Sequence, residues 1–202
     1  MKLGFLASFI ALIGIISFSI RRQNKQRKQQ EDAFWDRERR ANNVRRKSLD
    51  GLSYITIPLE TFPTHLLQDN AVVRECIETL SSLTSQKIVN LTGWSNTDLK
   101  LEYGTANINL LSEYDQNYTV LVRTLQKWAD ELLAAGFADE AAVLMEFAVN
   151  TGTDVGATYY KLADYRASMG QWEQIDGLIE KAQGLNSLNK DVILKHLREK
   201  SI

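Results

Sequence analysis

A 34-residue repeat is the feature that most constrains how this chain folds. The segment GFADEAAVLMEFAV occupies positions 136–149, and GQWEQIDGLIEKAQ occupies positions 170–183. Both copies place apolar residues at helical spacing, and small residues at matching positions allow two helices to cross closely. Laying one copy on the other aligns a glycine and two alanines of each: Gly136 with Gly170, Ala129 with Ala163 and Ala148 with Ala182. The alignment favours one helical hairpin used twice over two unrelated amphipathic hairpins.

Apolar residues at three- and four-residue steps predict the helices of these hairpins. The first helix is expected over 121–133, with Gly136 ending it and Asp139 opening the next helix. The final stretch, NKDVILKHLREKSI, predicts an amphipathic capping helix with a solvated His196 and with three residues facing inward, namely Val192, Ile193 and Leu197. Two hairpins and a cap therefore account for residues 119–202.

Residues 122–155 and 156–189 resemble the tetratricopeptide repeat family, whose unit is a 34-residue helix–turn–helix. In the second copy an aromatic-x-x-Leu-small start is followed by a Gly-x-aromatic turn, as Tyr159, Leu162, Ala163, Gly170 and Trp172. The chain departs from the family pattern at Arg166, where a Tyr is usual, and lacks the closing Pro in both copies. The resemblance implies stacked hairpins with a concave surface that holds a peptide or protein segment.

The helical phase of the first helix in each repeat identifies the side chains expected to line this surface. They are Arg123, Gln126, Lys127, Asp130, Tyr160, Asp164 and Tyr165. We therefore expect a membrane-tethered adaptor or scaffold for protein–protein interaction. The alternative is a structural anchor component of an envelope or secretion assembly, in which the N-terminal segments do the recognition.

The membrane expectation comes from residues 3–20, LGFLASFIALIGIISFSI, which carry no charge. As a helix this run spans roughly 27 Å, close to the hydrocarbon thickness of a bilayer. A basic cluster follows at once, which favours an uncleaved transmembrane helix over a cleaved signal peptide. The positive-inside rule then places the N-terminus outside and the C-terminal domain in the cytoplasm.

Residues 21–48 form a basic juxtamembrane linker or helix, with eleven Lys/Arg against four Asp/Glu. Anionic lipid headgroups are the expected partners of its first basic residues, which are Arg21, Arg22, Lys25, Arg27 and Lys28. Phe34 and Trp35 either pack on the body or enter the headgroup region. No nucleic-acid reading element accompanies the cluster, so nucleic acid is not an expected partner.

Residues 49–118 form an irregular and helical first part of the body. Asp69 or Asn70 is expected to cap a helix that reaches Leu83. In the polar stretch 88–118 we expect a short helix capped by Asn96 or Thr97, although Leu99, Leu101 and Tyr103 also alternate as in a strand. The same stretch holds the one plausible catalytic cluster, which consists of Asp98, Lys100, Glu102 and Asp115. Its alternative interpretation is a set of hydrogen-bonded turns.

The composition excludes several classes of site. Cys76 is the only cysteine, which excludes a disulfide framework and a zinc site with several thiolates. The chain contains no Gly-rich phosphate loop, nucleophile elbow or metal-binding His pair. We therefore assign no catalytic, cofactor or metal residues and expect a protein that is not an enzyme. The predicted fold class is mainly α, with a transmembrane helix (1–20), a charged linker (21–48) and a helical body (49–118 and 119–202) that ends in two repeats and a cap.

Overall fold

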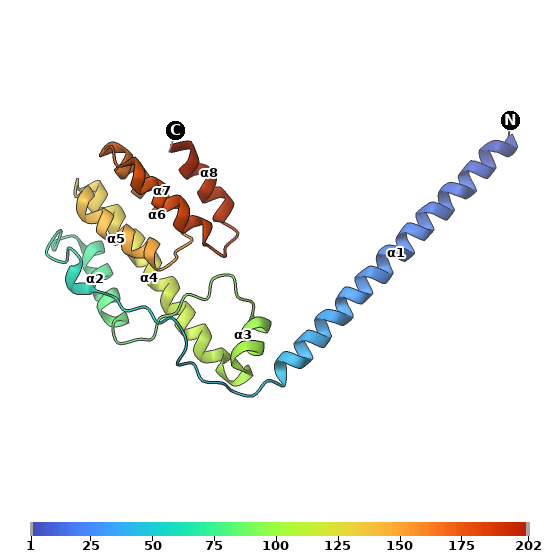
Figure 1. Ribbon diagram of the computed structural model, residues 1–202, viewed down its shortest axis with the longest axis horizontal. Coiled ribbons are helices and arrows are strands. Elements are labelled where there is room, and N and C mark those ends of the chain that lie inside the picture. Colours follow the sequence, from blue (N-terminus) through green and yellow to red (C-terminus); the bar gives the residue numbers. More distant parts are fainter. Residues whose placement is uncertain (1, 201–202) are drawn as a thin grey trace. The chain divides into compact units, whose positions relative to one another are not determined.

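The structure is a computed structural model that describes the backbone of residues 2–200 and the side chains of residues 19–200. Within this range the chain is mainly helical, as expected, and also has short 3-10 turns at Leu59–Thr61 and Thr105–Asn107. The α-helices, labelled in Figure 1, are α1 (Lys2–Asn42), α2 (Ala71–Leu83), α3 (Asn96–Tyr103), α4 (Ile108–Ala134), α5 (Ala138–Asn150), α6 (Gly156–Ser168), α7 (Trp172–Gln183) and α8 (Lys190–Lys200).

The chain forms two compact units, and neither is continuous in sequence. The first unit contains Met1–Lys47 and Ser95–Ile108, and the second contains Ser48–Trp94 and Asn109–Ile202. The 88–118 stretch, expected as one region, is therefore shared between the two units.

The predicted transmembrane anchor is wrong. Among the residues that the structure describes, no helix is both long and apolar enough to cross a bilayer. The apolar run and most of the basic segment, for which a linker or a helix was expected, belong to one 41-residue helix, α1, which ends at Asn42. The single-pass topology, with its outside N-terminus and cytoplasmic C-terminal domain, is corrected with the anchor. The side chains of residues 3–18, on which the prediction was based, lie outside the described residues.

The basic residues assigned to lipid lie exposed on α1, and Arg27 pairs with Glu31 one helical turn later at 3.4 Å. Phe34 and Trp35 are also exposed, at 54% and 56%, with their rings edge to face at 5.2 Å. These contacts do not test the assignment of the basic residues to lipid headgroups, which stays a prediction.

Helix α3 packs against the C-terminal part of α1 through polar contacts. Glu38 of α1 accepts a hydrogen bond from the Thr97 hydroxyl at 2.6 Å and forms an ion pair with Lys100. Arg37 pairs with Asp98. The N-cap of α3 is Ser95, not the expected Asn96 or Thr97, and Asp98 completes a capping box with it. The Asp98 carboxylate therefore caps the start of α3 and also binds α1.

The chain leaves α1 through a turn that is fixed by the fully buried Asn107. Its amide nitrogen donates to the carbonyls of Lys47 at 2.8 Å and Tyr103 at 2.7 Å. Its amide oxygen accepts from Arg46 at 2.9 Å. Gly104 is required beside it, because φ is +86° and a Cβ would lie 2.3 Å from the Arg45 carbonyl oxygen. These contacts join α3 to the end of α1 as one body.

Helices α4 to α8 of the second unit repeat one pattern of burial with the 34-residue period of the sequence. Apart from the turn glycines Gly136 and Gly170, the positions that sequence aligns in the two repeats are buried, for example Leu125 with Tyr159 and Ala129 with Ala163. The helix starts follow the same period, since α7 begins as many positions after α5 as α8 begins after α6. The family resemblance itself stays a prediction, but these helices share starting positions and buried faces at the expected spacing.

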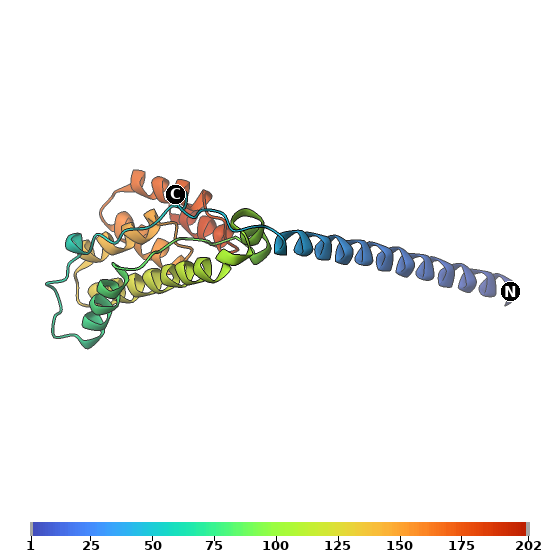
Figure 2. The same cartoon turned by 90° about the horizontal axis from the view of Figure 1, so that it is seen from below.

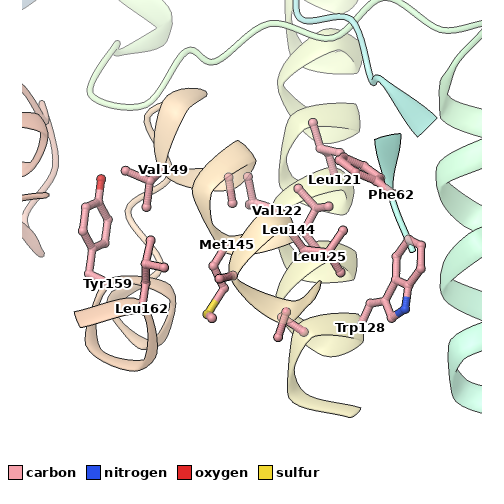
Figure 3. Packing of buried hydrophobic residues seen from close by; sticks show 14 of the residues in the cluster. Phe62, Leu121, Val122, Leu125, Trp128, Leu144, Met145, Val149, Tyr159 and Leu162 are labelled. Atoms are coloured by element: carbon pink, nitrogen blue, oxygen red, sulfur yellow. The ribbon is translucent and has the colours of Figure 1, made fainter. Parts of the chain in front are cut away.

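The core forms where the first and second helices of successive hairpins meet. Figure 3 shows Leu144 and Met145 of α5 between Leu125 of α4 and Leu162 of α6. The aligned alanines are at most 1% exposed, which brings helix backbones close together: Ala129, Ala148, Ala163 and Ala182. A large side chain at any of these positions would force the helices apart.

Glycines end the first helices with the same geometry. The amide of Gly136 donates to the carbonyl of Leu133 at 3.1 Å, and the next amide donates to the carbonyl of Leu132 at 2.9 Å. Gly170 makes the equivalent pair of bonds after α6, at 3.0 and 2.9 Å. Both glycines have positive φ, +86° and +68°, which defines a Schellman turn.

The capping helix α8 packs differently from its prediction. Ile193 and Leu197 are buried as expected, but Val192 is 62% exposed and Leu194 is buried in its place. The reason is the 34-residue phase, which aligns Ile193 with the buried Tyr159 and Leu197 with the buried Ala163. Helix α8 is therefore in phase with the first helices α4 and α6, and it packs against both α6 and α7 (Figures 1 and 2).

Residues 52–91 complete the second unit. Asn70 caps α2 by accepting from the amides of Val72 at 2.8 Å and Val73 at 3.3 Å, as expected. The extended segment before it buries Phe62, whose ring contacts Phe147 of α5 edge to face at 5.3 Å. An isolated antiparallel bridge joins Tyr54 to Val89. The second unit thus has an apolar core that continues beyond the repeats.

We predict opposite effects on stability for two glycine-to-alanine substitutions. Gly170→Ala places a Cβ at positive φ and should lower the free energy of unfolding by about 1–2 kcal/mol. Gly177→Ala lies inside α7, where a Cβ meets nothing within 4 Å, and should raise it by about 0.5–1 kcal/mol. Urea denaturation of both variants measures the two changes. Shifts of the same sign would contradict the assigned turn.

We predict that acid weakens the packing of α3 on α1. Hydrogen bonds from Lys100 and Thr97 lower the pKa of Glu38 below its ordinary 4.5, and those from Ser95 lower the pKa of Asp98 below its ordinary 3.8. The charged forms are stabilised, so the contribution is complete above about pH 5 and is lost as pH falls through the lowered values. NMR of the α3 amides between pH 7 and pH 3 should follow this loss.

The matched variant for the acid experiment is Glu38→Gln, which removes one of the two titrating groups. Its α3 amides should already be less protected at pH 7, and they should change less on acidification. An acid response identical to that of the unsubstituted chain would contradict the role of Glu38.

Candidate functional site

The candidate site is the outward side of α4, α6 and α8, which we call the first-helix face. The 34-residue phase places three equivalent positions of each helix on it. The face consists of Gln126, Lys127 and Asp130 on α4, Tyr160, Lys161 and Asp164 on α6, and Leu194, Lys195 and Arg198 on α8. Apart from the buried Leu194, these side chains are half-buried or exposed.

Polar contacts connect α4 to α6 within the face. The Gln126 amide donates to Asp130 at 2.5 Å and accepts from the Thr158 hydroxyl at 2.6 Å. Lys161 forms an ion pair with Asp130 at 2.7 Å. Gln126 and Asp130 therefore hold α6 beside α4, in addition to presenting polar groups outward.

Helices α6 and α8 are joined by an ion pair and a ring contact. Asp164 pairs with Lys200 at 2.7 Å, and the ring of Tyr160 lies 4.0 Å from that of His196 at an angle of 37°. The expected solvated His196 is corrected, because its ring is half-buried and its Nε2 is buried without a hydrogen-bond partner among the described residues. Tyr160 covers this ring from the side of the face.

The structure brings together four of the seven residues expected to line the groove. Gln126, Asp130, Tyr160 and Asp164 take part in the contacts between α4, α6 and α8 described above. The other three take no part in these contacts. Lys127 pairs with Glu75 of α2 at 2.7 Å, the Tyr165 hydroxyl donates to Asp139 of α5, and Arg123 is exposed on α4.

Sequence reasoning missed the part of the face that α8 contributes. Lys195 and Arg198 line a surface hollow of about 420 Å³, together with Leu194, Asp191 and Glu199. A second application of the 34-residue shift would have found them, because Lys127, Lys161 and Lys195 are equally spaced. Treating the last helix as a cap hid this relation.

The face has an excess of positive charge. It carries four basic residues, which include Arg198 and a lysine on each helix, and two acidic residues, Asp130 and Asp164. Both acidic groups are already paired with lysines. Within the described part of the chain, Lys195 and Arg198 form no ion pair, and neither does the neighbouring Arg123. These three cations are therefore available to an acidic partner.

Three of the four residues considered for catalysis make structural contacts. Asp98 and Lys100 hold α3 on α1, and the hydrogen bonds to Ser95 keep the pKa of Asp98 below its usual range. Asp115 belongs to the other unit, where its carboxylate accepts from the amide of Leu91 at 3.1 Å. Glu102 is exposed on α3. Asp98, Lys100 and Glu102 belong to one unit, and Asp115 belongs to the other.

Two buried tyrosines, Tyr118 of α4 and Tyr159 of α6, are held in their neutral form. Burial raises the pKa of Tyr159 to about 12, and it also raises the pKa of Tyr118. The Tyr118 hydroxyl donates to the carbonyl of Thr151 at 3.2 Å. These hydroxyls are packing groups and are not poised to take up or release protons near neutral pH. Over the described residues, no cluster of three His, Cys, Asp or Glu side chains could hold a metal ion.

Comparison with protein-family models, curated proteins and solved structures finds no match to this chain.

Proposed function

We propose that this protein is an interaction adaptor whose first-helix face binds a short, extended, acidic segment of a partner protein. The observation that supports it best is the repetition of one surface pattern on three helices in phase. Stacked helical hairpins commonly use this side of their first helices to hold extended peptides. The proposal requires no membrane attachment.

Charge selects the class of partner. Lys195 and Arg198 lie at one end of the face, Arg123 lies near the other, and none of them is in an ion pair with another described residue. Complementary charge on the partner would raise the rate of association and exclude basic segments. The ion pairs already made by Lys161 and Asp164 keep the middle of the face close to neutral.

The spacing of the helices sets the length of the segment. Packed helices lie about 8–10 Å apart, so the distance across α4, α6 and α8 is about 16–20 Å. An extended chain advances about 3.3 Å per residue, which makes the bound segment about six residues long. Tyr160, at the centre of the face, offers a ring for one apolar side chain of that segment.

We predict that a random hexapeptide library selected on the immobilised full chain will be enriched in acidic sequences. The enrichment should decrease with added salt, since exposed charges are screened within about 10 Å at 0.1 M ionic strength. Replacing Lys195 and Arg198 together by Glu should weaken binding of the selected peptides by roughly tenfold or more, or about 1.4 kcal/mol. Fluorescence anisotropy measures this change.

The matched control is Arg74→Glu, which reverses an exposed charge on α2 outside the face. This variant should bind the selected peptides as the unsubstituted chain does. Selection without an acidic bias, or equal binding by the Lys195/Arg198 double variant, would contradict the proposal.

A further inference from the structure

A second candidate site lies away from the first-helix face, in a cavity of about 310 Å³ between α5, α6 and α7. This volume is at the lower end of the range for small-molecule pockets, about 300–1,000 Å³. The apolar part of its lining is Val149, Leu162 and Leu178, one residue from each helix. None of its lining residues belongs to the first-helix face, so it is independent of the proposed function.

The cavity contains a largely buried guanidinium group. The side chain of Arg166 is only 14% exposed, and burial lowers its pKa from the usual value. It forms an ion pair with Glu146 and donates a hydrogen bond to Gln171 at 2.6 Å. A guanidinium has five N–H donors, so these two contacts do not exhaust its capacity to bind an anion.

A second cation lines the same cavity. Lys181 of α7 donates to the side-chain oxygen of Asn150 on α5, and Gln174 adds a neutral amide. With Glu146 as the acidic member, the ionisable lining residues carry a net charge of +1. An anionic group would complement this charge, and a planar carboxylate matches the donor geometry of a guanidinium.

Gly177 keeps one wall of the cavity open. It lies in the interior of α7, where a glycine costs roughly 0.5–1 kcal/mol relative to alanine. Its φ is not in the left-handed region, and a Cβ would meet nothing within 4 Å. Neither backbone conformation nor crowding requires glycine here. The structural consequence of the missing side chain is access to the cavity.

We propose that this cavity binds a carboxylate carried on a small branched apolar group. The apolar group would contact Val149, Leu162 and Leu178, and the carboxylate would bind beside Arg166 and Lys181. Such a ligand could be a free organic acid or the C-terminal residue of another chain. Both present the same carboxylate chemistry to the cavity.

The test uses two acids and their neutral amides with the ¹⁵N-labelled full chain. The free-acid pair is 4-methylpentanoate and 4-methylpentanamide, and the chain-end pair is N-acetyl-leucine and N-acetyl-leucine amide. At least one acid should shift the amide resonance of Gly177 and the Nε–H resonance of Arg166 saturably, with an affinity roughly tenfold or more above that of its amide. The pair that binds more tightly identifies the source of the carboxylate.

Two kinds of variant test the space in the cavity and its charged groups separately. Gly177→Leu should fill the cavity and abolish the shifts, whereas Gly177→Ala should retain them; the circular dichroism of both should match that of the unsubstituted chain. Replacing Glu146 and Arg166 together by Gln removes the ion pair without leaving one charge unpaired. This double variant should lose the preference for acid over amide.

Three results would overturn the proposal. The first is the absence of saturable shifts at Gly177 and Arg166 with both acids. The second is equal binding of acids and amides by the unsubstituted chain. The third is unchanged binding in a folded Gly177→Leu variant.

Discussion

The two helices of one hairpin cannot bury all of their own apolar side chains against each other. The second unit depends on neighbouring helices to bury the apolar surface that remains. Tyr159 and Leu162 of α6 are completely buried only because α5, α7 and α8 all pack around that helix. Close approach at Ala129 and Ala163 makes this packing possible, since both alanines are 0% exposed. Repeats of 34 residues bury this apolar surface by stacking so that equivalent residues of successive helices face the same side.

The same constraint determines what remains on the surface. When Leu125, Tyr159 and Ile193 all turn inward, the residues two positions later, Lys127, Lys161 and Lys195, lie outward or at the edge. Equivalent positions then form rows across α4, α6 and α8. Some members of these rows hold the helices together, as Asp130 and Lys161 do. Others, such as Lys195 and Arg198, remain free of ion pairs within the described residues and give the face its charge.

Much of the helical body could be predicted from sequence because its signals are local. Asn70 is a strong N-cap residue, and Gly136 and Gly170 mark positive φ at helix ends, so α2 and the repeat turns were found. Val192 was wrongly expected to face inward because it is apolar and the 34-residue phase was not applied to it. The helical phase of α4 and α6, which is also a local signal, predicted part of the face through Gln126, Asp130, Tyr160 and Asp164.

Other features depend on contacts between distant residues, which a single sequence does not reveal. Asp98 and Lys100 resembled a polar cluster of possible catalytic use, but their partners Arg37 and Glu38 lie about sixty positions earlier. The cavity beside Arg166 requires three helices and a glycine that has no local signature. The anchor was inferred from residues 3–20 and the basic cluster that follows them, whereas the helix that contains both extends to Asn42.

The central claim is that α4, α6 and α8 are stacked in one phase. Nitroxide labels at the exposed or half-exposed lysine positions test it, in the pairs 127/161 and 161/195, by dipolar broadening of the electron paramagnetic resonance spectrum. Adjacent packed helices lie about 8–10 Å apart, so both pairs should be broadened to a similar degree. Broadening in the first pair with none in the second would show that α8 does not continue the array and would contradict the account.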